Sequence, residues 1–156
     1  MKILMVCLGN ICRSPLAEGI MRHKIQQRQL ADWVVDSAGM GNWHSGELPD
    51  ARSIATARKY AIDITDQRAR QFQVADFDRF DLILAMDRSN YRDLLSLASS
   101  DEHRSKVDMI LAIAHPGSQE QVPDPYWDND GFEPVFHLLN DACDKIIEQL
   151  LHNKQL

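Results

Sequence analysis

Short runs of consecutive apolar residues alternate along the chain with stretches in which apolar residues recur every three or four positions. The runs at residues 2–8, 33–39, 80–87 and 107–113 predict four buried strands, because strands of a parallel sheet are covered on both faces. The periodic stretches predict helices at about residues 14–30, 50–60 and 89–97, and a long final helix. The stripe of that final helix comprises Val135, Leu139, Ala142, Ile146 and Leu150, with Cys143 beside it.

The alternation of strands and helices predicts an α/β fold with three layers, in which helices cover both faces of a four-stranded parallel sheet. No linker or low-complexity stretch interrupts it, so residues 1–156 are expected to form a single domain. In such folds ligands bind beyond the carboxyl ends of the strands. The loop after the first strand is therefore the first place to look for chemistry.

Composition narrows the classes of function. The chain has 156 residues, 44% of them hydrophobic, and a net charge of -6, so no general affinity for nucleic acid or anionic membranes is expected. No apolar run approaches the roughly 20 residues of a membrane span. Three cysteines are too few for a secreted disulfide framework, and we expect a cytoplasmic protein with free thiols.

The segment CLGNICRSP, residues 7–15, follows the first strand and leads into a helix for which Ser14 is the expected N-cap. Backbone N–H groups at a helix N-terminus form an anion cradle, and Arg13 adds a planar fork suited to two phosphate oxygens. Gly9 and Asn10 are the residues most able to take left-handed backbone angles there. The positive potential at the helix N-terminus and Arg13 also favours the thiolate of Cys7, to which the Ser14 hydroxyl can donate. The loop therefore predicts a nucleophile that attacks phosphorus.

Two other interpretations of the cysteines are weaker. In the first, Cys7 is only a small buried hydrophobic residue. That interpretation gives no reason for an arginine at position 13, beside the core. A zinc site built on Cys7 and Cys12 would need two further ligands, and neither Cys143 nor any of the six histidines has suitable spacing. We therefore expect no metal and no cofactor.

The segments VCLGNICRSP, DSAG, MDRSN and DPYW, in this order, resemble the low-molecular-weight protein tyrosine phosphatase family over essentially the whole chain. The resemblance implies hydrolysis of phosphotyrosine through a phosphocysteine intermediate. It makes Cys7 the nucleophile and Arg13 the phosphoryl-binding residue, with Asn10 shaping the loop and Ser14 supporting the thiolate. Substrate-binding roles extend to the other loop residues: Leu8, Gly9, Ile11 and Cys12.

Expulsion of a phenolate calls for a carboxylic acid near the leaving oxygen. Asp124 lies between two prolines after the fourth predicted strand, a pattern that is equally typical of a turn, and the family resemblance identifies it as the general acid and then base. Asp87 is the alternative, although its position before a helix also suits an N-cap. His44 and His115 are weaker candidates.

Aromatic residues near the loop predict the choice of substrate. Tyr126 and Trp43 are placed to stack on a phenyl ring, which would exclude the shorter phosphoserine. The resemblance supports both assignments, whereas Trp127 departs from the Tyr-Tyr pair common in the family and suggests an altered rim for peptide selection. The family resemblance also implies that Ser37 hydrogen-bonds the loop asparagine and that Cys12 forms a protective disulfide with Cys7.

Three other functions were weighed. Thiol-dependent arsenate reductases resemble the same fold, but they relay a disulfide through further cysteines, and none occurs between Cys12 and Cys143. A silent phosphotyrosine-binding module would lack Cys7, Arg13 or Asp124, and a nucleotide-binding protein would carry a glycine-rich motif. The expected partner is a tyrosine-phosphorylated protein, among bacterial relatives often a tyrosine kinase, with inorganic phosphate as product. The protein is expected to be a monomer or a weak dimer.

Overall fold

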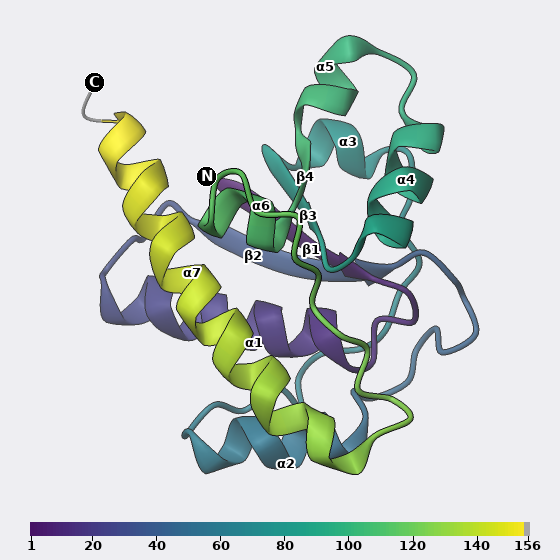
Figure 1. Ribbon diagram of the computed structural model, residues 1–156, viewed down its shortest axis with the longest axis vertical. Helices are drawn as coiled ribbons and strands as arrows, with labels where there is room; N and C mark the ends of the chain where they lie inside the picture. The colour runs from purple at the N-terminus through teal and green to yellow at the C-terminus, as the bar shows by residue number, and fades with distance from the viewer. Residues whose placement is uncertain (155–156) are drawn as a thin grey trace.

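The computed structural model describes residues 1–154 and contains a four-stranded parallel sheet in the order β2-β1-β3-β4 (Figure 1). β1 (Lys2–Cys7) lies at the centre, paired with β2 (Val34–Gly39) and β3 (Leu82–Ala85), and β4 (Val107–Met109) lies at an edge. This is the parallel α/β fold that the hydrophobic pattern predicts.

Helices connect the strands. The longest are α1 (Arg13–Gln27), α2 (Ala51–Lys59), α4 (Arg88–Leu97) and α7 (Phe132–Lys154). Short helical turns, which the apolar pattern does not predict, are α3 (Asp76–Arg79), α5 (Asp101–Ser105), α6 (Ile110–Ala114) and the 3-10 turn η1 (Asn129–Gly131). None of the helices within residues 1–154 is long and apolar enough to cross a membrane.

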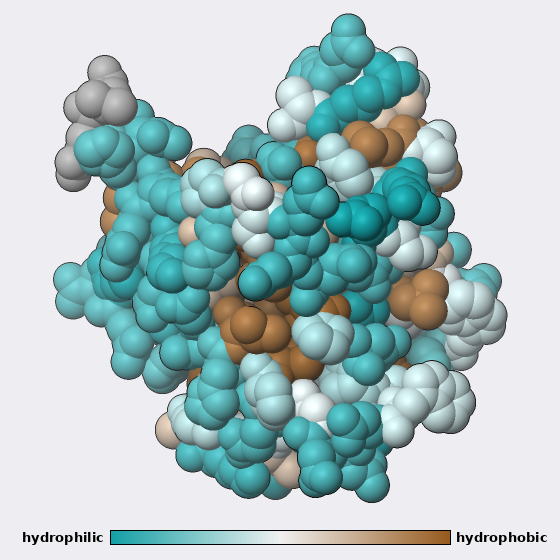
Figure 2. Space-filling view, viewed as in Figure 1, coloured by the Kyte–Doolittle hydropathy of each residue, from teal (hydrophilic) through white to brown (hydrophobic). Residues whose placement is uncertain are grey.

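The alternation of side chains along β1 creates the two cores. Ile3, Met5 and Cys7 belong to one buried cluster with residues of α1 and α7, whereas Leu4 and Val6 belong to a second cluster with residues of α3 and α4. Successive residues of a strand point to opposite faces, so one apolar strand holds both helical layers. Figure 1 shows α1 and α7 on one side of the sheet and α3 and α4 on the other. The face seen in Figure 2 is mostly hydrophilic, with its broadest hydrophobic patch near the centre, beside α7, and smaller ones toward the right.

Two boundary predictions are wrong. The run at residues 107–113 is not one strand: β4 ends at Met109, and residues 110–114 form α6. A short apolar run cannot distinguish a buried strand from a buried helical turn. Ser14 is not an N-cap, because α1 begins at Arg13 and Cys12 occupies the cap position without a side-chain capping bond. The Ser14 hydroxyl is used elsewhere.

The sheet order places the loops after β1 and β3 next to each other. The backbone N–H of Met86, which follows β3, donates to the carbonyl of Val6 at 3.1 Å. After β1 the chain first adds β2 on one side of it and then β3 on its other side. Ligands of parallel α/β folds bind at the point where the strand order reverses in this way. The segments that carry Cys7, Arg13 and Asp87 therefore meet at the carboxyl ends of β1 and β3.

Candidate active site

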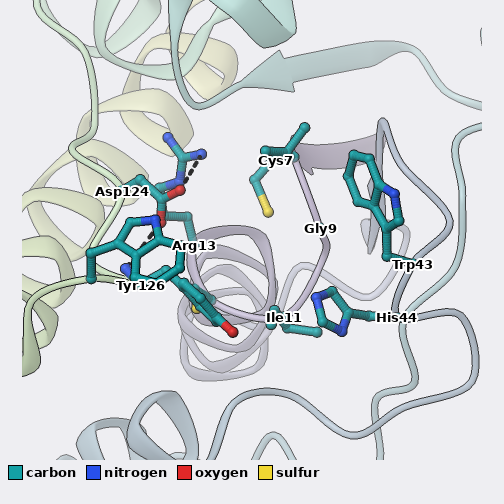
Figure 3. Close-up of a pocket in the computed structure, with 11 residues that line it drawn as sticks. Cys7, Gly9, Ile11, Arg13, Trp43, His44, Asp124 and Tyr126 are labelled. Carbon is teal, nitrogen blue, oxygen red and sulfur yellow. Dashed lines mark hydrogen bonds and ion pairs between the residues drawn. The ribbon is translucent and has the colours of Figure 1, made fainter.

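A cavity of about 290 Å³ opens at the carboxyl end of β1. Figure 3 shows the sulfur of Cys7 directed into it, with Trp43 on one side and Tyr126 and Asp124 on the other. The cavity therefore brings together residues from three separate parts of the sequence. Its lining is Cys7, Leu8, Gly9, Ile11, Cys12, Arg13, Trp43, His44, Asp124, Tyr126 and Trp127.

Buried polar side chains fix the loop after β1 through hydrogen bonds. Asn10 has φ 57°, the left-handed conformation predicted for it, while Gly9 does not. A Cβ on Gly9 would lie 3.2 Å from Cδ2 of His44, so this glycine allows a close approach of the ring. Asn10 Nδ2 donates to the hydroxyls of Ser14 at 2.7 Å and Ser37 at 3.0 Å. The contact predicted between Ser37 and the loop asparagine is thus present.

Cys7 and Ser14 are both buried, and Cys7 Sγ lies 3.0 Å from Ser14 Oγ. Cys12, in the same loop, is a free thiol, and burial raises its pKa to about 12. Cys143 is also free, lies fully buried on α7, and has its pKa raised to about 12 by the same cause. The Cys7 sulfur is directed into the cavity (Figure 3), whereas the raised pKa values keep Cys12 and Cys143 as thiols.

Arg13 is almost completely buried, and its Nη1 is anchored at two points. It donates to Asp87 Oδ2 at 2.8 Å and to the Val122 carbonyl at 3.0 Å. The other oxygen of Asp87 accepts from the backbone N–H of Asn90 and caps α4, as its position in the sequence suggests. Both oxygens of Asp87 are thus occupied, which removes it as a proton donor and makes it an anchor for the guanidinium.

Asp124 differs from Asp87 in its exposure and in having one oxygen that accepts no hydrogen bond from residues 1–154 but lies at ion-pair distance from Arg13. Its side chain is 41% exposed, Oδ1 accepts from the backbone N–H of Tyr126 at 3.1 Å, and Oδ2 lies 3.8 Å from Arg13 Nη2. One oxygen is therefore fixed while the other faces the cavity beside the arginine (Figure 3). A carboxyl group in this position can give a proton to a ligand atom and take one back.

The cavity rim is aromatic and much more exposed. Trp43 and Trp127 are 67% and 88% exposed, and Tyr126 is 37% exposed. The Arg52 guanidinium, which sequence reasoning missed, lies 5.5 Å from the centre of the Tyr126 ring and is itself fixed by hydrogen bonds to Asp50. Nothing in the local pattern of α2 points to this contact, because it joins segments more than 70 residues apart.

The two histidines considered as acids lie in different places. His44 lines the cavity, and its Nδ1 lies 2.5 Å from Glu47 Oε2. His115 lies outside the cavity, with Asp141 and Lys145 of α7 as neighbours. Across residues 1–154 no group of three or more His, Cys, Asp or Glu side chains is arranged to hold a metal ion.

Comparison with known proteins gives consistent results. Residues 2–156 match the family model described as low molecular weight phosphotyrosine protein phosphatase. A Synechocystis protein of the same family name is 46% identical over 152 residues, covering 96% of each chain. The low molecular weight phosphotyrosine protein phosphatase of Sus scrofa is 38% identical, covering 95% of this chain and 94% of its own. The crystal structure of a protein tyrosine phosphatase from Entamoeba histolytica, with Hepes in its active site, superposes with a TM-score of 0.91 at 36% identity, covering 99% of both chains.

Proposed function

The chain belongs to the low molecular weight phosphotyrosine protein phosphatase family, and from this premise we propose that Cys7, Arg13 and Asp124 carry out its reaction. The protein is a cysteine-dependent protein tyrosine phosphatase that acts on phosphotyrosine in proteins. The observation that supports these residue roles is that one cavity is lined by a thiol, a buried guanidinium and a carboxyl group with one oxygen at ion-pair distance from that guanidinium.

In the first step the Cys7 thiolate attacks phosphorus, an S–P bond forms, and the bond from phosphorus to the tyrosyl oxygen breaks. Asp124 gives its proton to that oxygen, so that tyrosine leaves as a neutral phenol. Arg13 Nη1 is occupied by Asp87 and Val122, so the edge of the guanidinium formed by Nε and Nη2 is the one that binds two phosphoryl oxygens.

In the second step water attacks the phosphocysteine. Asp124, now a carboxylate, takes a proton from the water, the S–P bond breaks, and inorganic phosphate leaves with the Cys7 thiolate restored. The loop amides and Arg13 stabilise the charge that develops on the phosphoryl oxygens in both steps. Trp43 and Tyr126 form the walls of a slot in which a phenyl ring reaches Cys7 and a phosphoserine does not.

The direct test is phosphate release from a phosphotyrosyl peptide in the presence of a chelator, for the native protein and Cys7→Ser. Turnover by the native protein alone supports the proposal. Equal activity would remove Cys7 as the nucleophile, and equal inactivity would refute the residue roles. An arsenate reductase relay is disfavoured by the complete burial of Cys143 on α7.

A protective disulfide between Cys7 and Cys12 is part of the proposal. Hydrogen peroxide would oxidise the Cys7 thiolate to a sulfenic acid, and the Cys12 sulfur would displace its hydroxyl group, forming the disulfide and releasing water. Both cysteines line the cavity, but burial keeps Cys12 a thiol and slows its attack. Mass spectrometry after mild peroxide treatment should show a loss of two hydrogens in the peptide with both cysteines, reversed by dithiothreitol.

The physiological partner proposed here is a tyrosine-phosphorylated protein, a tyrosine kinase among the candidates, in the reducing environment of the cytoplasm, which suits three free cysteines. Residues 1–156 act as one phosphatase domain, working as a monomer or a weak dimer. Sedimentation of the purified chain over a range of concentrations tests the oligomeric state.

A further inference from the structure

One buried carboxyl group has no part in the proposed mechanism. Glu18 is 3% exposed, lies on α1 one turn beyond Ser14, and does not line the cavity. Its Oε1 accepts from the Ser37 hydroxyl at 2.7 Å, and its Oε2 accepts from the Arg22 guanidinium. Burial raises the pKa of this carboxyl group to about 7, although both donors favour the charged form. A buried ionisable group in such a position needs an explanation.

The hydrogen bonds beneath the loop have only one consistent direction. The backbone N–H of Arg70 donates to Asn10 Oδ1 at 3.0 Å, and a backbone N–H can only donate, so the orientation of the Asn10 amide is fixed. The two hydrogens on Asn10 Nδ2 are then directed to the hydroxyl oxygens of Ser14 and Ser37. Each serine therefore accepts from Asn10 and keeps one hydrogen of its own.

The hydroxyl hydrogens of Ser37 and Ser14 form the two outer bonds of this hydrogen-bond network. The Ser37 hydrogen goes to Glu18 Oε1, and the Ser14 hydrogen is left for Cys7 Sγ at 3.0 Å. Above its pKa of about 7 the Glu18 side chain is a carboxylate, which only accepts, so in that form it cannot reverse the direction of the hydrogen bonds. The result is a continuous run of hydrogen bonds between a buried carboxylate and the sulfur, with Asn10 in the middle.

We propose that Glu18 is a positioning residue for the phosphatase: as the fixed acceptor for Ser37, it holds Asn10 and Ser14 so that the Ser14 hydroxyl donates to the Cys7 thiolate. This inference rests on the proposed role of Cys7 as nucleophile. Glu18 acts through three other side chains and touches neither substrate nor sulfur. Its removal should therefore change the ionisation of the thiol more than the binding of phosphate.

The charged groups around Glu18 indicate which substitution tests this. Arg22, on the same helix, donates to Glu18 and also to Asp66 at 3.0 Å, and Asp36 of β2 lies next to Ser37. In Glu18→Gln, the arginine holds the amide carbonyl and the amide NH₂ group faces Ser37. The Ser37 hydrogen then loses its acceptor while the side chain keeps its volume.

The experiment measures the rate of alkylation of Cys7 by iodoacetamide as a function of pH, with the modified peptide identified by mass spectrometry. Cys12 and Cys143, each with a pKa raised to about 12, stay unreactive below pH 8. In Glu18→Gln we expect the midpoint of the alkylation curve to rise by about half to one pH unit and kcat to fall about two- to tenfold, which is the range for one weakened hydrogen bond. Glu148→Gln, on the exposed side of α7, is the control for loss of one negative charge.

A double-mutant cycle with Ser37→Ala provides the second measurement. If Glu18 acts through Ser37, then Glu18→Gln should have almost no further effect once the Ser37 hydroxyl is absent. Glu18→Gln with Arg22→Gln also removes the cation that has lost its charged partner on α1, and this double variant serves if the single variant folds poorly. An unchanged alkylation midpoint, additive effects in the cycle, or a loss of kcat that accompanies only a lower Tm would each overturn the inference.

The alkylation measurement requires no turnover, so it separates this inference from the proposed function. A shifted midpoint in a protein that does not hydrolyse phosphotyrosine would mean that the residue roles proposed for catalysis fail while the positioning role stands. Hydrolysis by the native protein together with an unshifted midpoint in Glu18→Gln would mean the reverse.

Discussion

The two sides of the cavity differ in how they are held. On the side of the loop after β1, Asn10 and Arg13 are at most 3% exposed, and each is fixed by two or more hydrogen bonds. On the opposite side, Trp127 is 88% exposed, and Asp124 has one oxygen without such an anchor. Buried groups anchored by hydrogen bonds are pre-organised for charge stabilisation, whereas exposed groups can adapt to a peptide. We therefore expect the phosphate-binding loop with Arg13 to be rigid, and the exposed side with Asp124 and the aromatic rim to be adaptable.

The largest effect should come from the buried side. Arg13→Lys loses the planar fork and the anchor to Asp87, so kcat/KM should fall about 10²- to 10³-fold, as for the loss of other charge-stabilising donors. Steady-state kinetics with a phosphotyrosyl peptide measure it, and circular dichroism shows whether the variant is folded. A folded variant with nearly native kcat/KM would mean that rigid placement of the guanidinium is not required.

A smaller effect on kcat is expected on the exposed side. Asp124→Asn cannot supply a proton, so kcat for phosphotyrosine should fall about 10²-fold. The loss should be much smaller for an aryl phosphate whose phenolate leaves without protonation, such as p-nitrophenyl phosphate. Equal losses for both substrates would contradict the role of general acid. Because the side chain is 41% exposed, Tm should be nearly unchanged.

On the buried side, Glu18 should make the free energy of unfolding depend on pH. The pKa of Glu18 is raised from 4.5 to about 7, so the folded state favours the protonated carboxyl group. Its contribution to stability is fully present below pH 4.5 and is lost as the pH rises to about 7. Between these pH values the native protein should lose about 2–3 kcal/mol relative to Glu18→Gln. Urea unfolding at several pH values measures this, and parallel curves for the two proteins would contradict it.

The smallest effect should come from the rim. Trp127→Ala should raise KM for a phosphotyrosyl peptide about two- to tenfold and leave kcat unchanged, because one exposed aromatic contact contributes about 0.5–1.5 kcal/mol. The KM for p-nitrophenyl phosphate, which lacks flanking residues, is the control and should not change. A lower kcat would show that the aromatic rim, in addition to Asp124, contributes to the chemistry.

Much of the reaction centre was predictable from the sequence because its residues are close together along the chain. Cys7, Arg13 and Ser14 belong to one loop between a strand and a helix, so local spacing alone puts a thiol at the mouth of an anion cradle. Continuous apolar runs likewise predict a parallel sheet. The sequence predicts two uses for Ser14, since both suit a serine at a helix start: its contact with the Cys7 sulfur is present, and the predicted cap of α1 is not.

The α/β order of elements, the loop with its proposed nucleophile, and the set of candidate acids and aromatic residues could all be predicted from the sequence. The local pattern left Asp87 and Asp124 open, and the family resemblance favoured Asp124. Only the tertiary structure showed that Asp87 anchors Arg13, ended β4 at Met109, and joined Glu18 to Cys7 through Ser37. The physical reason is the range of the interactions. Backbone propensity and hydrophobic period act over a few residues, whereas the partner of a buried polar group is set by which strands lie side by side, and that pairing is fixed only when the whole sheet forms.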